Sequence, residues 1–210
     1  RNGQFAGIDV ELATEAFSRL GYTPEFRTIS WPDKDNLLSD GTIDCIWSCF
    51  SMNGRETKYQ WAGPHMYSRQ VVAVRADSDI QSLSDLADKR IGVQATTKAE
   101  SLFLGEISSL LPEVKQVNSF ETTEDMFAAL RKGYVDAVAG HEALVAKLTN
   151  LDESLYESEL GVAFAKDTHE DLAVHLTQTL EDMKQDGTIG RVAEKFGLDA
   201  EKTVWGEQEK

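Results

Sequence analysis

The chain has 210 residues, of which 41% are hydrophobic, and this is enough apolar material to fill one large domain or two small lobes. Its 36 acidic and 21 basic residues give a formal net charge of −15, spread along the chain. This balance argues against a nucleic-acid-binding protein, because phosphate binding requires a basic surface. The longest uncharged apolar runs, such as IWSCF and VVAV, are far shorter than the roughly 20 residues that span a bilayer.

The first half of the chain alternates helical and strand patterns with short turns. Apolar residues at helical spacing predict a first helix over residues 8–20, with Gly21 just beyond its end. A near-continuous apolar run over residues 43–50 is typical of a strand buried on both faces. The other elements expected in this half are strands at 24–31 and 71–75 and a short helix at 35–39.

The second half repeats the same alternation. Ser82 and Asp85 indicate a helix start, and a longer helix over residues 97–111 is expected to end at Pro112. The expected strands are 90–94, 114–117, 134–139 and 161–165, and the remaining expected helices are 123–132, 142–148, 167–185 and 189–196. Strands and helices that alternate in this way predict an α/β fold in two units, one of residues 1–74 with the C-terminal helices and one of residues 76–162.

The two cysteines, Cys45 and Cys49, are too few for a disulfide framework or a zinc site. Side chains four residues apart on an extended segment lie roughly 13 Å from each other, so we expect buried small side chains here in preference to a disulfide. The histidines have no metal-ligand spacing, and none of the motifs GxSxG, GxGxxG, HExxH or the P-loop occurs. We therefore expect no metal and no cofactor.

Polar residues follow several of the predicted strands. Thr96 and Thr97 stand where a strand turns into a helix, and free backbone N–H groups there either bind a small anion or are capped by the threonines. Arg55 lies in a loop after the apolar run 43–50, where its guanidinium either clamps a carboxylate or is a solvated surface group. His141 and Glu142 follow another strand and either meet a ligand ammonium or begin a helix.

Aromatic residues flank these loops. Trp31 and Phe50, together with Trp47 and Trp61, either stack on a ligand or pack in the core.

Six segments occur in an order that resembles one family, the polar amino-acid solute-binding proteins of ABC importers. They are FAGIDVELATEAFSRLGY, GTIDCIWSCFSMNGRE, WAGPHMYSRQVVAV, LADKRIGVQATT, LRKGYVDAVAG and ELGVAFAKD, and together they cover nearly the entire chain. The resemblance implies a type II periplasmic-binding-protein fold, in which two α/β lobes joined by two hinge strands close over one ligand. Lobe 1 would comprise residues 1–74 and 165–210 and lobe 2 residues 76–162, with the hinge near 73–77 and 163–167.

The resemblance also assigns roles to residues. Arg55 and Ser51 would bind the ligand carboxylate, although the loop between them is one residue shorter than usual, and Cys49 would offer a carbonyl to the ammonium. Thr96 and Thr97 would complete the carboxylate site. Where the family usually has an aspartate that pairs with the ammonium, this chain has His141, so either Glu142 substitutes or the ligand is not an ordinary α-amino acid.

A second departure concerns the start of the chain. The family has a strand and an aromatic loop before the segment that corresponds to NGQFAGIDVELA, so we expect lobe 1 without its first strand and with an open sheet edge. Such an edge allows a strand-swapped dimer.

The resemblance implies an extracytoplasmic protein, periplasmic or lipid-anchored, that captures an amino acid or related carboxylate for a bacterial ABC permease. The absence of catalytic motifs favours a binding protein over an enzyme. Two alternatives are the ligand-binding domain of a receptor kinase, which uses the same module, and a cyclohexadienyl-type dehydratase, which would need an acidic group such as the pair His141 and Glu142.

Overall fold

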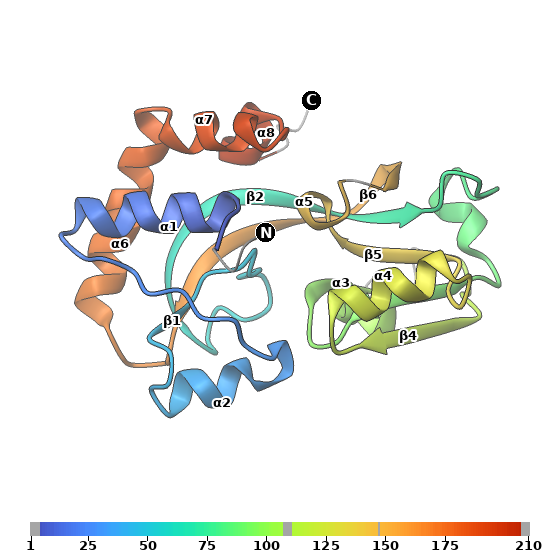
Figure 1. Cartoon of the computed structure of the whole chain (residues 1–210), viewed down its shortest axis with the longest axis horizontal. Coiled ribbons are helices and arrows are strands. Elements are labelled where there is room, and N and C mark those ends of the chain that lie inside the picture. Colours follow the sequence, from blue (N-terminus) through green and yellow to red (C-terminus); the bar gives the residue numbers. More distant parts are fainter. Residues whose placement is uncertain (1–4, 107–110, 147, 207–210) are drawn as a thin grey trace. The chain divides into compact units, whose positions relative to one another are not determined.

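The computed structural model describes residues 5–106, 111–146 and 148–206. In this part of the chain the helices are α1 (Ile8–Arg19), α2 (Lys34–Ser39), α3 (Lys98–Ser101), α4 (Thr123–Arg131), α5 (Glu142–Val145), α6 (Glu170–Gln185), α7 (Thr188–Lys195) and α8 (Ala200–Trp205). The strands are β1 (Cys45–Ile46), β2 (Gln60–Val74), β3 (Arg90–Gln94), β4 (Gln116–Phe120), β5 (Ala137–His141) and β6 (Thr149–Phe164) (Figure 1). Short helical turns lie at Trp31–Asp33 (η1), Leu83–Leu86 (η2) and Leu102–Glu106 (η3).

The strands of the described residues follow the order β1-β6-β2-β5-β3-β4 in a mixed sheet. β3 pairs in parallel with β4 and with β5, whereas β2 and β5 are antiparallel, as are β1 and β6. The predicted α/β fold is therefore confirmed.

The chain divides into two compact units, one of residues 1–29, 34–68 and 158–210 and one of residues 30–33 and 69–157. The chain passes from one unit to the other inside the two long strands: after residue 68 in β2 and before residue 158 in β6. The hinge expected near 73–77 and 163–167 stays a prediction, and the strands expected at 71–75 and 161–165 are only the most apolar ends of β2 and β6. β2 and β6 span 15 and 16 residues, and their first parts contain polar residues at many positions.

Unit 1 is built mainly from helices on the strands β2 and β6. In α1 the buried residues recur at helical spacing, which directs one face of the helix into the core. Helix α1 lies beside α6 and α7, and α7 packs against α8 (Figure 1). The core of this unit is formed by apolar residues of these elements: Leu12, Ala16, Phe17, Leu160, Val162, Phe164, Leu176, Leu180, Met183, Ile189 and Val204.

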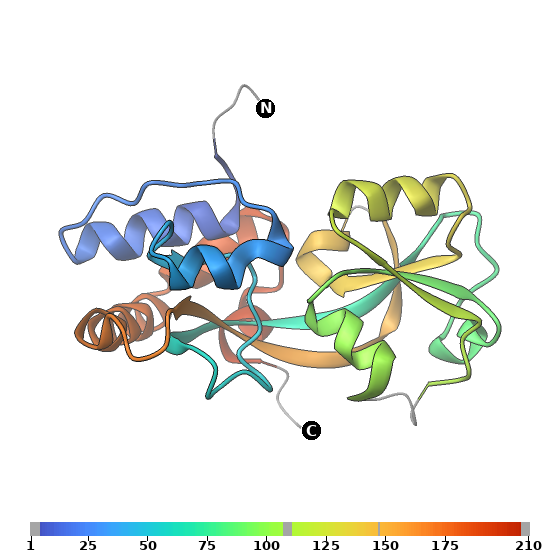
Figure 2. The same ribbon diagram turned by 90° about the horizontal axis from the view of Figure 1, so that it is seen from below.

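Unit 2 carries helices on both faces of its strands (Figure 2). Val72 and Val74 of β2 pack with α3 and the turn η2, whereas their neighbours Val71 and Ala73 pack with α4 and α5. Because successive strand residues point to opposite faces, a strand covered on both faces must be apolar at every position. Residues 71–74 and 137–139 meet this condition, and all are buried.

The strand predicted at 24–31 is wrong, and the strand predicted at 43–50 is much shorter than expected. Residues 24–30 form no strand, because among the described residues no neighbouring strand pairs with them. The apolar run 43–50 contains only the two-residue β1, which pairs with β6 and turns away soon after, since Cys49 has a left-handed backbone with φ 45°. The apolar side chains of this run pack against neighbouring side chains, but its backbone pairs with another strand over two residues only.

The other predicted elements differ mainly at their ends. The strand at 90–94 matches the prediction, the helix predicted at 123–132 ends one residue earlier at Arg131, and the capping box of Ser82 and Asp85 begins the turn η2. The helix expected over residues 97–111 stops at Ser101 and continues as a π-helical turn to Glu106, and its residues 107–110 lie outside the described part. The helix expected over 142–148 ends at Val145, and residue 147 lies outside as well. Helix α8 is not among the elements predicted from the sequence.

No helix in the described residues combines the length and the hydrophobicity that a bilayer crossing requires.

Candidate functional site

The candidate residues of unit 1 lie on one loop between β1 and β2. Arg55 is half-buried, its Nη1 donates to the carbonyl oxygen of Ser51 over 3.2 Å, and its guanidinium carbon lies 5.2 Å from the centre of the Phe50 ring. The Arg55 N–H donates to the carbonyl of Met52 over 2.8 Å and closes a tight turn. The loop therefore holds the backbone of Arg55 close to Ser51, as a carboxylate clamp would require.

The start of this loop is tied to β6. Ser51 is 1% exposed and forms an isolated bridge with Leu160, and the Met52 N–H donates to the carbonyl of Glu159 over 2.8 Å. The Oδ1 of Asn53 accepts the Glu159 N–H over 2.8 Å. These contacts fix residues 51–53, which lie just before Arg55 in the loop.

Cys49 packs against the first turn of α1. Its thiol donates to the Oδ2 of Asp9 over 3.5 Å, and its backbone N–H is a second donor to this carboxylate. Burial is the main cause that raises the pKa of Asp9 to about 6, and the hydrogen bonds from Cys49 oppose it. Burial also raises the pKa of the Cys49 thiol well above its usual range, so this group is an inert thiol.

Both cysteines are free. The expectation of free cysteines in preference to a disulfide is confirmed, but both are only partly buried and not buried as expected. Burial raises the pKa of Cys45 to about 12.

In unit 2, Thr97 is the N-cap of α3. Its hydroxyl accepts the Glu100 N–H over 3.4 Å and donates to the carbonyl of Gln94 over 2.7 Å. The Thr96 N–H donates to Oε2 of Glu100 over 2.7 Å, and Oε1 of Glu100 accepts the hydroxyl of Ser119. The chain's own carboxylate therefore occupies the helix start that the sequence suggested for an anion, and Thr97 acts as a cap.

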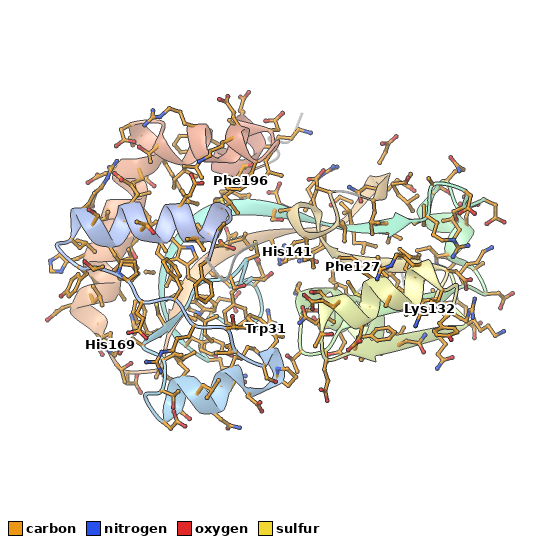
Figure 3. All side chains as sticks on the ribbon, in the orientation of Figure 1. Trp31, Phe127, Lys132, His141, His169 and Phe196 are labelled. Atoms are coloured by element: carbon orange, nitrogen blue, oxygen red, sulfur yellow. The ribbon has the colours of Figure 1, made fainter. Side chains whose placement is uncertain are left out.

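His141 ends β5 and precedes α5, where Figure 3 labels it. The amide nitrogen of Gln70 lies 3.1 Å from Nδ1 and 3.0 Å from Nε2 of His141. The neighbouring Glu142 accepts two hydrogen bonds from Arg69, of 2.6 Å from Nη2 and 3.1 Å from Nε. Both carboxylate oxygens of Glu142 are therefore engaged by one guanidinium.

Gln70 and Arg69 are functional candidates that the sequence interpretation missed. They stand directly before the strand residues 71–75, so their position at the start of an apolar run is the signal that could have identified them.

Trp31 belongs to the turn η1, is half-buried and is grouped with unit 2 (Figure 3). The structure thus brings together Cys49, Phe50, Ser51 and Arg55 on one loop of unit 1. In unit 2 it brings His141 and Glu142 against Gln70 and Arg69, and it puts Thr96 and Thr97 at the start of α3.

Comparison with known proteins identifies the family. The model of the bacterial extracellular solute-binding proteins, family 3, matches residues 1–199. The chain belongs to this family.

No cluster of three or more histidine, cysteine or acidic side chains in the described ranges has the arrangement of a metal site.

Relatives within family 3 are named as binding proteins. The chain is 26% identical over 209 residues to the probable amino-acid-binding protein YxeM of Bacillus subtilis (strain 168), covering 93% of this chain and 77% of that protein. It is 25% identical over 218 residues to the L-cystine-binding protein TcyJ of Escherichia coli (strain K12), covering 96% of this chain and 78% of that protein.

A solved structure of an amino acid-binding protein has the same fold. The ancestral amino acid-binding protein AncCDT-1, described as a precursor of cyclohexadienyl dehydratase, matches with a TM-score of 0.81 at 26% identity. The match covers 93% of this chain and 87% of that one. The type II periplasmic-binding-protein fold expected for this family 3 member is confirmed.

Proposed function

We propose that this chain captures an amino acid or a related small carboxylate outside the cytoplasmic membrane and delivers it to an ABC permease. Membership of family 3 and the names of its amino-acid-binding relatives support this proposal. The observation that carries it is the loop of unit 1, which holds Arg55 beside the buried Ser51. A guanidinium fixed in this way recognises a carboxylate through two parallel hydrogen bonds.

In unit 1 the proposed ligand contacts are Arg55 and Ser51 to the carboxylate and the carbonyl of Cys49 to the ammonium, with Phe50 as apolar lining. The hydrogen bonds that tie residues 51–53 to β6 support this assignment, because they leave the loop little freedom to collapse. A loop that is ordered before binding loses less conformational entropy when the ligand arrives.

In unit 2 the proposed contacts are His141 and Glu142, with Trp31 as an aromatic neighbour. Thr96 and Thr97 stay predicted contacts, although in this structure Glu100 and the cap of α3 engage them. Since both oxygens of Glu142 accept from Arg69, we favour His141 as the group nearest the ligand amine. A neutral imidazole accepts one hydrogen bond from an ammonium but supplies no counter-charge. We therefore include carboxylates that lack an α-amine among the candidate ligands.

The hinge near residues 73–77 and 163–167 and the closure of the two lobes stay predictions, as does a strand-swapped dimer. Location in the periplasm or on a lipid anchor is part of the proposal, and the description of the family as extracellular supports it. The names of the relatives favour transport over a receptor-kinase sensor or a dehydratase, and we propose no enzymatic activity.

The test begins with a thermal-shift screen of the purified protein against the twenty common amino acids, L-cystine and a set of carboxylates without an α-amine. A ligand at a hundred times its dissociation constant stabilises the folded state by about 2.7 kcal/mol, so micromolar binders are detected at millimolar concentration. Calorimetric titration of each hit then gives its affinity. Absence of any hit would contradict the proposed function.

The variant Arg55→Ala tests the assignment of the carboxylate site. Loss of a charge-assisted clamp costs about 1.5–3 kcal/mol, which corresponds to a roughly ten- to hundredfold weaker affinity. Arg27→Ala is the matched control, because Arg27 is an exposed arginine of the same unit that pairs with Glu25. Equal affinities of Arg55→Ala and the parent would show that the carboxylate binds elsewhere.

A further inference from the structure

The carbonyl oxygen of Arg55 accepts two hydrogen bonds. One comes from the N–H of Lys58 over 3.0 Å and continues the turn. The other comes from the indole Nε1 of Trp61 over 3.1 Å. The indole donor belongs to strand β2, and it binds the backbone of the residue that carries the proposed clamp.

The indole ring of Trp61 is itself fixed. Its centre lies 5.3 Å from the ring centre of Phe50 and 5.3 Å from that of Tyr59, and the tyrosine hydroxyl donates to Asp35. Aromatic rings at this spacing contribute about 0.5–1.5 kcal/mol beyond the area that they bury. The N–H of the indole therefore points at the Arg55 carbonyl from a ring that has few alternative positions.

Gly161 of β6 completes the support for this ring. A Cβ atom built on Gly161 would lie 2.9 Å from Cε3 of Trp61 and 2.6 Å from Sδ of Met52. Distances this short are not tolerated between non-bonded carbon or sulfur atoms, so glycine lets Trp61 and the loop pack this closely on β6. The strand backbone, the indole ring and the Arg55 loop thus form one packed stack within unit 1.

We propose that Trp61 is a positioning residue for ligand binding: its indole N–H holds the loop backbone at Arg55, so that the guanidinium is ordered before a carboxylate arrives. This inference rests on the proposed role of Arg55 in carboxylate binding. Arg55 is constrained at both ends. Phe50 contacts its guanidinium, and the Trp61 indole binds its backbone carbonyl.

The decisive variant is Trp61→Phe, which keeps an aromatic ring and removes the N–H donor. The ligand for this test is the compound from the thermal-shift screen (the twenty amino acids, L-cystine and amine-free carboxylates) that stabilises the parent protein. Because one hydrogen bond that orders the binding loop is lost, we expect its affinity to fall about three- to tenfold. Trp47→Phe is the matched control. Trp47 is a half-buried tryptophan of the same unit whose Nε1 has no hydrogen-bond partner in the described residues, and its replacement should leave affinity unchanged.

A double-mutant cycle separates positioning from general damage to the fold. In the Arg55→Ala background, Trp61→Phe should change affinity by less than about twofold, because the group that it orders is no longer present. An equal loss in both backgrounds would overturn the inference.

Amide hydrogen exchange in the ligand-free protein gives a readout that does not depend on the proposed function. We expect the amides of Arg55 and Lys58 to exchange faster in Trp61→Phe and unchanged in Trp47→Phe. Faster exchange without any carboxylate binding by the parent would contradict the proposed function but retain the ordering role of Trp61. Unchanged exchange at both amides would overturn the inference directly.

Discussion

The thiol of Cys49 donates a hydrogen bond to the Oδ2 of Asp9 across 3.5 Å and joins two segments that lie 40 residues apart in the chain. Asp9 stands in the first turn of α1, and Cys49 begins the loop that carries Ser51 and Arg55. The other carboxylate oxygen, Oδ1, is buried without a hydrogen-bond partner among the described residues. A carboxylate that is buried and half-satisfied resists ionisation, and this makes the stability of unit 1 depend on pH.

Asp9→Asn should remove this dependence. Because the pKa of Asp9 is about 6 in the folded protein and 3.8 in the reference state, the group's favourable contribution is complete below about pH 4 and is lost as pH rises through 6. Two pKa units correspond to about 3 kcal/mol. We expect Asp9→Asn to be more stable than the parent by up to about this amount at pH 7 and similar to it at pH 4, as measured by urea unfolding.

Asp40→Asn is the control for Asp9. Asp40 is exposed, accepts the Thr42 N–H over 2.9 Å, and has a lowered pKa caused first by its hydrogen bonds to Thr42. Its contribution is therefore lost as pH falls, which is the opposite direction. A gain at pH 7 in Asp40→Asn, or none in Asp9→Asn, would contradict our interpretation.

His65 should make the protein less stable as the pH falls, which is opposite to the effect of Asp9. The ring is fully buried, lies 5.3 Å from the Trp47 ring, and has no hydrogen-bond partner at either nitrogen among the described residues. Burial first and the charge of Lys184 second lower its pKa to about 3. The folded state therefore resists protonation, and stability is lost as pH falls from the usual histidine pKa of about 6.5 toward 3.

His65→Phe removes this penalty and keeps a ring against Trp47. At pH 5 the unfolded chain gains about 2 kcal/mol by protonating His65, so the variant should gain roughly this much more stability at pH 5 than at pH 8. Urea unfolding at the two pH values measures the difference. His175→Phe, at an exposed position of α6, should show no such gain, and an equal gain there would exclude burial of His65 as the cause.

Gly161→Ala should destabilise unit 1. The added methyl group would meet Met52 and Trp61 at 2.6 and 2.9 Å, and overpacking of this kind costs about 1–3 kcal/mol. Gly190→Ala is the matched control, because a Cβ there lies 3.6 Å from its nearest neighbour inside helix α7, where alanine is favoured by about 1 kcal/mol. Thermal unfolding should separate the two variants in opposite directions. A Gly161→Ala protein as stable as the parent would mean that Met52 and Trp61 move aside freely.

His141→Asp tests which ligands this chain prefers. An aspartate at this position supplies a counter-charge for an ammonium, so we expect about tenfold tighter binding of α-amino acids and no gain for carboxylates that lack the amine. Calorimetric titration of both ligand classes gives the comparison. His175→Asp introduces the same charge on α6 of unit 1 and should have no effect. No gain in His141→Asp would indicate that another group already binds the ammonium.

Much of the secondary structure follows from local signals. The helix predicted at 123–132 and the strand predicted at 90–94 follow from the alternation of helical and strand patterns, and the structure has them at 123–131 and 90–94. The failures have one cause. Residues 24–30 have the composition of a strand, but a strand requires a partner whose backbone accepts its hydrogen bonds, and composition carries no record of that partner.

In the candidate site, too, local signals identify residues but not their partners. Arg55, Thr97 and His141 are predicted site residues because they follow apolar runs, and strand ends and helix starts present polar groups at a sheet edge. Ser51 is predicted only through the family resemblance. Sequence alone left open whether Glu142 is available to a ligand. The structure pairs it with Arg69, 73 residues away, and this pairing follows from the ladder between β2 and β5 that brings Gln70 opposite His141.

The sequence by itself therefore determined the fold class, the family and the loop that carries Arg55, since all three depend on the local order of residues. Only the tertiary structure decided the partners of those residues: Cys49 with Asp9, Arg69 with Glu142, and the Trp61 indole with the Arg55 carbonyl. The physical reason is that side-chain contacts depend on the register of strands and the packing of helices. These bring together residues whose separation along the chain carries no information about their distance in space.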